Sequence, residues 1–330
     1  MVDYSDELRW GLRLEVLRRH ARTELEKSQW LPLRSIELLQ MRRLRVLLKD
    51  AYESVPYYHR VFNEMKIHPD DIRTPEDFSK LPVLKKEEVR NHAEEMVSRK
   101  CKIRDLREFR TAGSTSIPLK GYMNAEMRAY ADASSLRHRR WMNLDEHTTI
   151  AYVGPLGLNW YPNIAEEHLC LYSWQMNEEK FTEFIKNIKK YKPQLLNAFA
   201  GGLNLLAQYC EARGITDIAF QAIITSGEKL YRNEKERIER VFGCEVYERY
   251  AASEPGTMAF DCSKHSGLHI CSESMLIEFL KDGEPARPRE LASIVVTSLF
   301  SYCMPLIRYD LQDAAYKMDK PCSCGRELPS

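Results

Sequence analysis

Residues 195–254 decide the fold, and they read LLNAFAGGLNLLAQYCEARGITDIAFQAIITSGEKLYRNEKERIERVFGCEVYERYAASE. Leu195 to Phe199 is a short apolar run typical of a strand, and Leu203 to Ala212 has the apolar spacing of a helix. The same alternation repeats downstream. It predicts a strand over Ala219 to Thr225, a helix over Asn233 to Phe242 and a strand over Cys244 to Tyr250. Strands and helices that alternate in this way favour a mainly parallel sheet with helices on its faces.

The sequence on either side of this stretch shows different patterns of apolar residues. Residues 5–65 are predicted to be helical, with an interruption at Val55 to Tyr58, because proline disfavours helix in the residue before it. Met275 to Leu280 and Leu291 to Leu299 are predicted to pair antiparallel around a turn. We therefore expect an α/β protein in three parts: a helical N-terminal region (1–106), an α/β core (107–260) and a β-rich C-terminal part (261–330).

Composition excludes several classes of function. The chain has 330 residues, a net charge of +1, 44% hydrophobic and 29% charged residues, which is ordinary for a soluble globular protein. This charge gives no sign of a nucleic-acid partner. No apolar run approaches the roughly 18 residues of a membrane helix, and the acidic N-terminus does not resemble a secretory signal. The sequence therefore predicts a cytoplasmic protein without a membrane partner, whose nine cysteines are buried thiols or metal ligands rather than disulfides.

Two turns have the composition of a nucleotide site. Thr111 to Ser116 is rich in hydroxyls around Gly113, and such a turn presents backbone N–H groups to a polyanion. It lacks the spacing of a Walker P-loop, and an ordinary loop is the alternative. Thr225 to Glu228 directly follows a predicted strand, where parallel sheets bind ligands. A helix cap at Ser226 is the alternative there.

Two further segments end predicted strands with charged groups. In Tyr250 to Glu254, Ser253 could donate to a phosphate and Glu254 could hold a magnesium ion, which prefers oxygen ligands. Downstream, Arg308 offers a planar fork for a phosphate or carboxylate, and Asp313 could accept hydrogen bonds from ribose hydroxyls. A structural ion pair is the alternative for Arg308 and Asp313.

A cluster of cysteines and a histidine predicts a structural zinc site. Thiolates and imidazole are the usual ligands of tetrahedral zinc, and four of them leave no open position for catalysis. The predicted ligands are Cys262, His269, Cys322 and Cys324, with Cys271 and His265 as alternatives. Buried thiols without metal remain the other interpretation. The remaining cysteines lie in apolar patterns and are predicted to be core: Cys101, Cys170, Cys210, Cys244 and Cys303.

Taken in order, these segments resemble the phenylacetate–coenzyme A ligase-like branch of the adenylate-forming superfamily, which includes capsule-biosynthesis homologues. The resemblance covers nearly the whole chain. The family's phosphate loop falls on Thr111 to Ser116, and its adenine-contacting Gly-Glu falls on Gly227-Glu228. Its Tyr-Gly-x-Ser/Thr-Glu motif falls on Tyr250 to Glu254, and its Arg-Tyr-x-x-Gly-Asp motif falls on Arg308 to Asp313.

The resemblance implies a layered adenylate-forming fold and roles for individual residues. Ser253 would contact the α-phosphate, Glu254 would carry magnesium, and Arg308 would complete the catalytic group. The implied nucleotide-binding residues are Thr111, Gly113, Ser114, Thr115, Gly227, Glu228, Tyr250 and Asp313. The implied acid-binding residues are Phe199, Ala200, Gly201 and Ala251.

The implied reaction is attack of a carboxylate on ATP to give an acyl-adenylate, with coenzyme A or another thiol or amine as acceptor. The acid is expected to be aryl or medium-sized. A homodimer is compatible with the resemblance. A non-catalytic adenylate-binding or scaffold homologue is the alternative, because side chains replace expected glycines at Ser116, Ala251 and Gln312. The chain is also expected to end before the family's hinge, so the lid domain with the lysine that assists adenylation would be absent.

Overall fold

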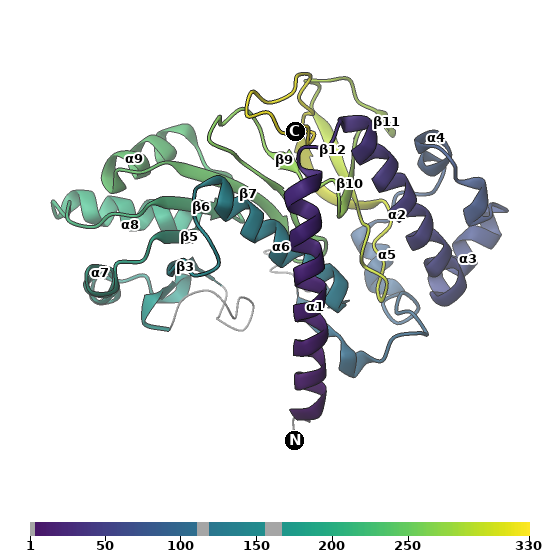
Figure 1. Cartoon of the computed structure of the whole chain (residues 1–330), viewed down its shortest axis with the longest axis horizontal. Helices are drawn as coiled ribbons and strands as arrows, with labels where there is room; N and C mark the ends of the chain where they lie inside the picture. The colour runs from purple at the N-terminus through teal and green to yellow at the C-terminus, as the bar shows by residue number, and fades with distance from the viewer. Residues whose placement is uncertain (1–3, 111–118, 156–166) are drawn as a thin grey trace. The chain divides into compact units, whose positions relative to one another are not determined.

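The computed structural model describes residues 4–110, 119–155 and 167–330, shown in Figure 1. The chain forms two compact units. Unit 1 contains Met1–Arg137, Ala252–Met258 and His269–Ser330, and unit 2 contains His138–Ala251 and Ala259–Leu268. The helical N-terminal region and the C-terminal strands, which the sequence separates, therefore belong to the same unit.

Most helices of unit 1 lie in its N-terminal part. They are α1 (Tyr4–Ser28), α2 (Leu33–Ser54), α3 (Pro56–Met65), α4 (Pro75–Ser79) and α5 (Lys86–Asn91). Helix α2 ends where the sequence predicts, because Val55 is extended (φ −106°) and Pro56 begins α3. Helix α6 (Ala125–Trp141) runs from unit 1 into the first residues of unit 2.

Most strands of unit 1 form a small antiparallel sheet and a hairpin. The sheet has the order β11-β10-β12-β13, formed by β10 (Met275–Lys281), β11 (Glu284–Pro285), β12 (Ala292–Ser298) and β13 (Tyr309–Ala315). Strands β10 and β12 pair antiparallel, as predicted. The hairpin joins β1 (Arg107–Arg110) and β2 (Lys120–Met123).

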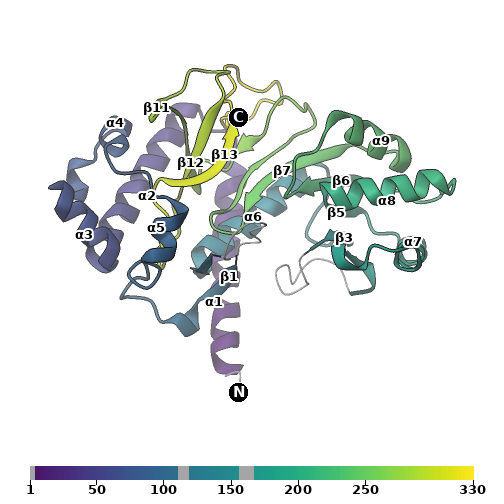
Figure 2. The same ribbon diagram turned by 180° about the vertical axis from the view of Figure 1, so that it is seen from behind.

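A short extended segment places α5 beside β13, as Figure 2 shows. The N–H of Leu84 donates to the carbonyl oxygen of Arg308 (2.9 Å), and the N–H of Asp310 donates to the carbonyl oxygen of Leu84 (3.0 Å). Because α5 begins two residues later at Lys86, these bonds fix the start of this helix next to Tyr309.

The main sheet is seven-stranded, with the order β4-β3-β5-β6-β7-β8-β9. Five neighbouring strands pair in parallel: β3 (Ile150–Gly154), β4 (Cys170–Tyr172), β5 (Leu195–Phe199), β6 (Ala222–Ser226) and β7 (Val246–Ala252). Strands β8 (Gly256–Phe260) and β9 (His269–Ile270) complete the order. The predicted α/β class and mainly parallel sheet are confirmed.

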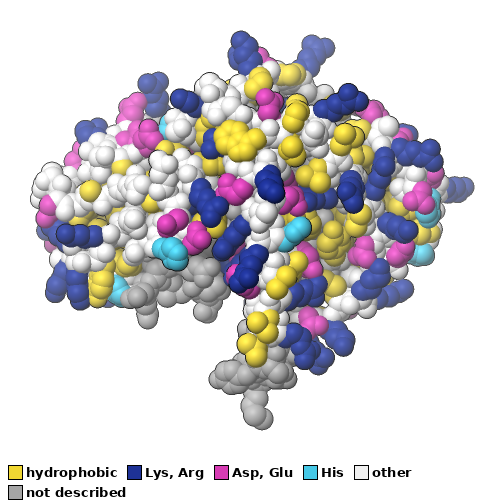
Figure 3. Space-filling view, in the orientation of Figure 1, with side chains coloured by type: hydrophobic (Ala, Val, Ile, Leu, Met, Phe, Trp, Pro, Cys, Tyr) yellow, Lys and Arg dark blue, Asp and Glu magenta, His cyan; other side chains and the backbone are white. Residues whose placement is uncertain are grey.

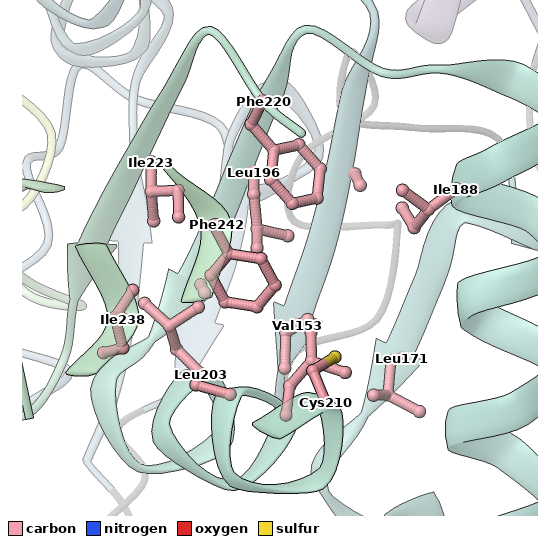
Figure 4. Close-up of a cluster of buried hydrophobic side chains, with 14 of the residues drawn as sticks. Val153, Leu171, Ile188, Leu196, Leu203, Cys210, Phe220, Ile223, Ile238 and Phe242 are labelled. Carbon is pink, nitrogen blue, oxygen red and sulfur yellow. The ribbon is translucent and has the colours of Figure 1, made fainter. Parts of the chain in front are cut away.

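Helices α7 (Glu178–Tyr191), α8 (Ala200–Ala212) and α9 (Arg232–Phe242) of unit 2 cover one face of its parallel strands. Figure 4 shows the resulting core, in which Leu203 and Cys210 of α8 lie close to Leu196 of β5 and Val153 of β3. These side chains are buried in a continuous apolar cluster. The apolar spacing of the sequence is therefore what directs each helix onto the sheet.

One prediction about the cysteines is wrong. Cys101 and Cys303, which the sequence assigns to the core as thiols, form a disulfide across 202 residues of sequence, with their Cα atoms 5.7 Å apart. Cys303 is buried, but Cys101 is half-buried between Lys100 and Lys102, and local patterns contain no signal that joins two such distant segments. Among the described residues, no helix has the length and apolarity needed to cross a bilayer.

Candidate functional site

The carboxyl edge of the parallel strands of unit 2 carries the first group of candidate residues. Because β3, β5, β6 and β7 are parallel, their carboxyl ends share one edge, where sheets of this kind bind ligands. Gly227 and Glu228 follow β6 directly, and Phe199 is the last residue of β5. The structure thus brings the predicted adenine-contacting and acid-binding segments to the same edge.

Both the backbone conformation at position 227 and the little space around it require glycine. Its φ is +82°, a left-handed conformation that residues with a side chain rarely adopt. A Cβ at this position would lie 2.2 Å from Cε1 of Phe199. The same ring lies close to Gly154 at the end of β3, where a Cβ would be 2.7 Å from Cδ2 of Phe199. The ring of Phe199 therefore packs between two glycine turns and forms an apolar wall at this edge.

Glu228 links the turn after β6 to the start of α8. Its Oε2 accepts a hydrogen bond of 2.6 Å from the backbone N–H of Gly201. A carboxylate is favoured at a helix N-terminus, where backbone N–H groups lack partners within the helix. Glu228 itself is exposed. This hydrogen bond connects the turn at Gly227 to the start of α8, directly after Phe199.

Unit 1 carries a second group, centred on the carboxylate of Glu254. This side chain is buried, and its Oε1 accepts a hydrogen bond from the hydroxyl of Tyr309 (3.1 Å). The ammonium nitrogen of Lys86 lies 3.5 Å from the same oxygen. Burial and the Glu254 carboxylate raise the pKa of Tyr309, so its hydroxyl stays protonated and donates. The carboxylate is thus held in place from two sides.

Sequence reasoning did not single out Tyr309 and Lys86 as site residues. The sequence does contain hints of both residues. Tyr309 lies inside the Arg308 to Asp313 motif, and Lys86 comes shortly after the segment Leu81-Pro82-Val83-Leu84. Their relation to Glu254 depends on the bonds between Leu84 and β13, and no local pattern predicts those bonds.

Arg308 is buried and fully engaged. Its guanidinium forms a bidentate ion pair with Glu278 (3.0 Å for both contacts) and donates to the carbonyl oxygens of Ser79 and Leu81. Its φ of +53° is unusual for a residue with a side chain. Burial raises the pKa of Glu278, and Arg308 opposes this rise by stabilising the charged form. The structure therefore contains the ion pair that the sequence left open as an alternative.

The other predicted residues occupy the same two units. In unit 2, Tyr250 and Ala251 are half-buried in β7, and Ala200 is buried at the start of α8. In unit 1, Ser253 is half-buried after β7, and Asp313 is exposed on β13. The predicted phosphate loop, with Thr111, Gly113, Ser114 and Thr115, lies outside the described residues.

Gln312, which occupies a glycine position of the family motif, keeps a left-handed backbone with φ +63°. Ala251, at another such position, lies within strand β7. Gln312 therefore holds a backbone conformation that glycine adopts more easily.

The predicted zinc ligands form a compact cluster. The ligand atoms of Cys262, His269, Cys322 and Cys324 all lie within 4.8 Å of one another. Cys262 belongs to the short segment 259–268, whose two ends continue directly into unit 1. Nε2 of His269 lies 3.3 Å from Sγ of Cys324, and its Nδ1 lies 3.3 Å from the carbonyl oxygen of Leu328.

The chemistry of this cluster fits zinc. Tetrahedral zinc with thiolate and imidazole ligands needs ligand atoms at roughly these separations, and a ligating histidine usually donates its other ring N–H to a carbonyl or carboxylate. Burial lowers the pKa of His269, which favours the neutral imidazole that binds metal. The alternative ligands His265 and Cys271 do not belong to this cluster. His265 pairs with Asp261 (2.5 Å), and burial raises the pKa of the Cys271 thiol to about 11.

Comparison with known proteins gives a consistent set of relatives. No family model matches the chain. Phenylacetate-coenzyme A ligase of Thermus thermophilus is 25% identical over 312 residues, covering 90% of this chain and 69% of the relative. The ligase of the same name from Escherichia coli is 25% identical over 307 residues, covering 88% and 69%. Protein CapK of Staphylococcus aureus is 21% identical over 287 residues, covering 84% and 62%.

A solved structure shares the fold. 2-Hydroxyisobutyryl-CoA ligase, solved in the postadenylation state with an adenylate, matches with a TM-score of 0.79 and 18% identity over 91% of this chain and 67% of that one. The chain spans about two thirds of the length of these proteins. The predicted resemblance to the phenylacetate–coenzyme A ligase-like branch and the adenylate-forming fold are confirmed.

Proposed function

Because the chain is related to phenylacetate–coenzyme A ligases and shares the fold of an acid–coenzyme A ligase, we propose that it is an ATP-dependent acid-activating enzyme. In the proposed reaction a carboxylate oxygen of the acid attacks the α-phosphorus of ATP. The bond to the bridging oxygen breaks, pyrophosphate leaves, and an acyl-adenylate forms. Transfer of the acyl group to coenzyme A would follow, as the names of the relatives suggest.

One observation supports this proposal most directly: the buried carboxylate of Glu254, held by Tyr309 and Lys86. Magnesium takes oxygen ligands and is commonly bound by one or two carboxylates together with substrate phosphates. Glu254 would hold the ion, which would neutralise phosphate charge during attack. Lys86 brings a second cation to the same carboxylate at 3.5 Å. Cationic groups that are already in position stabilise the charge that develops in such a step.

The edge of unit 2 supports the binding of adenine and acid. Gly227 has no side chain, so the ring of Phe199 packs closely against this turn, and we propose that adenine binds beside the same turn. The ring of Phe199 would form one wall for an apolar acyl group. We propose for Ser253, Asp313, Tyr250, Ala200, Gly201 and Ala251 the roles that the resemblance implies. Arg308, which is buried and engaged by Glu278 and two carbonyl oxygens, would support the site without contacting the substrate. The alternative of a non-catalytic homologue gains no support from the comparisons, whose named activities are ligase reactions.

Calorimetry provides the first test of the proposed function. The intact chain is titrated with ATP in the presence and absence of magnesium, and with phenylacetyl and acetyl sulfamoyl adenosine, which mimic acyl-adenylates. We expect binding of ATP that depends on magnesium and is strongly reduced by Glu254→Gln. Glu87→Gln, an exposed position on the helix that carries Lys86, should bind like the wild type. Absence of binding to every one of these ligands, together with no acid-dependent pyrophosphate release, would refute the proposal.

We also propose that the cysteine–histidine cluster holds a structural zinc ion that fixes the C-terminal residues to the segment before β9. Purified protein should contain about one zinc per chain by atomic absorption, and Cys322→Ser should lower both the zinc content and the melting temperature. Cys210→Ser, which changes a buried thiol in the core of unit 2, should keep its zinc. Wild-type protein without zinc, or Cys322→Ser with undiminished zinc, would contradict this assignment.

A further inference from the structure

A disulfide joins two irregular segments of unit 1. Cys101 lies in the segment 92–102, which follows α5, and Cys303 lies in the segment 299–308, which connects β12 to β13. Irregular segments lack the regular hydrogen bonds of helices and strands and open more easily than packed elements. A covalent bond between two of them therefore contributes much to fixing their positions.

The segment 299–308 leads directly to a residue that holds Glu254. Tyr309 begins β13, and its hydroxyl donates to the Glu254 carboxylate (3.1 Å). The segment is also held by hydrogen bonds, because the N–H of Ser98 donates to the carbonyl oxygen of Cys303 (2.8 Å). The hydroxyl of Tyr58 donates to another carbonyl oxygen of this segment (2.9 Å). Opening the disulfide would leave the approach to Tyr309 to such non-covalent contacts.

The other end of the disulfide lies in the segment that follows α5, the helix that begins with Lys86. The backbone of this segment is bound to the end of α2, because the N–H of Arg99 donates to the carbonyl oxygen of Ser54 (2.9 Å). The disulfide thus connects the part of the chain that carries Lys86 with the part that carries Tyr309. Both of these residues contact Glu254.

The two cysteines of the disulfide differ in exposure. Cys303 is buried, whereas Cys101 is half-buried between the exposed residues Lys100 and Lys102. The side chain of Lys100 is 55% exposed and pairs with Asp50 of α2 (2.7 Å). Figure 3 shows basic and acidic side chains interspersed over α2 and α3, as is usual for a surface that faces water. A thiol in solution can therefore approach Cys101, and exposed disulfides are the ones that exchange with thiols most readily.

The other cysteines indicate surroundings in which thiols persist. The remaining seven cysteines, all within the described residues, are not part of a disulfide. Cys262, Cys322 and Cys324 must be thiolates to take part in the zinc site proposed above. Where thiols persist, disulfides are uncommon, and those that form are usually transient and sense redox state or take part in catalysis. A disulfide in such a chain is therefore expected to open and close.

We propose that the Cys101–Cys303 disulfide is a redox switch that a dithiol opens, and that it sets how firmly Tyr309 and Lys86 hold Glu254. A thiolate of the dithiol attacks Sγ of Cys101, the S–S bond breaks, and Cys303 leaves as a thiolate. The second thiol of the reductant then releases Cys101. Two electrons and two protons pass to the protein, and the dithiol becomes a disulfide. Reoxidation by an oxidised dithiol is the reverse of these steps.

Thiol counting by mass spectrometry tests whether the disulfide opens in the folded protein. Purified protein is equilibrated in mixtures of reduced and oxidised dithiothreitol, quenched with acid, denatured and alkylated with N-ethylmaleimide. We expect seven alkylated cysteines in oxidising mixtures and all nine in reducing mixtures, with a return to seven on reoxidation. Nine alkylated cysteines in every mixture, or a disulfide that opens only in urea that unfolds the protein, would overturn the proposal.

Hydrogen exchange tests whether opening loosens the two segments. On reduction, the amides of residues 92–104 and 299–312 should exchange roughly tenfold faster or more, whereas those of β5 in unit 2 should not change. Cys101→Ser should exchange at the fast rate in oxidising and reducing buffer alike. Cys210→Ser, which keeps both cysteines of the disulfide, should respond to reduction like the wild type. Equal exchange rates in oxidised and reduced wild type would overturn the proposal.

Calorimetry with ATP and magnesium tests the effect on Glu254. Oxidised wild type should bind several-fold more tightly than reduced wild type, and Cys101→Ser should match the reduced form in both buffers. Equal affinity of the two wild-type forms would overturn the link between the disulfide and Glu254. This expected effect rests on the proposed function, in which Glu254 holds the magnesium ion. If neither form binds ATP, the proposed function fails, and the thiol counts and exchange rates decide on the switch by themselves.

Discussion

The two groups of candidate residues differ in how strongly they are built into the protein. In unit 1, Glu254 and Arg308 are buried and each is held by charged or hydroxyl partners from distant parts of the chain. In unit 2, Glu228 is exposed, and its carboxylate accepts a hydrogen bond from the backbone N–H of Gly201 at the start of α8. Glu254 and Arg308 therefore contribute to the stability of the fold, whereas Glu228 contributes one helix cap at the surface.

Arg308 should give the largest effect on stability. Replacing it by alanine leaves Glu278 without its bidentate partner and removes the donors that reach Ser79 and Leu81. Loss of one partner from a buried ion pair costs about 3–5 kcal/mol, so Arg308→Ala should lower the free energy of unfolding by that amount in urea denaturation. Arg232→Ala removes an ion pair whose arginine side chain is 93% exposed and should change stability by less than about 0.5 kcal/mol. Similar losses of unfolding free energy in Arg308→Ala and Arg232→Ala would contradict the expected difference between a buried and an exposed ion pair.

Replacement of Gly227 should have the second-largest effect on stability, because it combines backbone strain with steric crowding. Gly227→Ala forces a residue with a side chain into φ +82° and places Cβ 2.2 Å from the Phe199 ring. A left-handed conformation costs about 1–2 kcal/mol and overpacking adds a further 1–3 kcal/mol, so a total of about 3 kcal/mol is expected. Gly214→Ala has a similar φ of +62° but nothing within 4 Å, and should show the strain alone.

A double-mutant cycle separates the two parts of the Gly227 effect. In a Phe199→Ala background the ring is absent, so Gly227→Ala should lose only the strain component. If Gly227→Ala costs the same free energy with and without the ring, crowding by Phe199 plays no part and the apolar wall proposed at this edge is wrong.

Glu254→Gln should affect ligand binding more than stability. Glutamine keeps an oxygen that can accept from Tyr309 but loses the charge that faces Lys86, which lies at 3.5 Å. We expect a loss of about 1 kcal/mol in the free energy of unfolding, comparable to one hydrogen bond, and at least a tenfold weaker affinity for ATP with magnesium. Equal losses of affinity with and without magnesium would argue against a metal-binding role for this carboxylate.

The sequence predicts the parts of this structure that depend on local periodicity. Alternating strands and helices from Leu195 to Tyr250 indicate a parallel sheet, and the carboxyl edge of that sheet then indicates where Gly227 and Phe199 meet. No local sequence pattern predicts the contacts of Arg308 with Ser79 and Leu81, which lie more than 220 residues away in sequence. The disulfide of Cys101 with Cys303 is missed for the same reason.

Helix α1, which has both buried and exposed apolar side chains, shows another kind of limit. Periodicity predicts a helix over residues 5–65 and identifies apolar positions on it. It does not say which of two apolar faces packs on unit 1, because that depends on where Asp132 and Arg107, which contact this helix, lie. The structure supplies this information.

Gln312→Gly should give the smallest effect, and it should be stabilising. Gln312 already occupies φ +63°, so glycine relieves backbone strain of roughly 1 kcal/mol. The unfolded chain gains freedom with glycine, which costs about 0.4–1 kcal/mol, and the net gain is expected to be about 0.5 kcal/mol or less. Ala314→Gly, two residues further along β13, has no strain to relieve and should lose about 0.5–1 kcal/mol. Chemical denaturation should therefore rank Gln312→Gly above the wild type and Ala314→Gly below it. The opposite order would mean that the left-handed backbone at Gln312 is supported by side-chain contacts, and the glycine of the family motif would then be replaced at no cost.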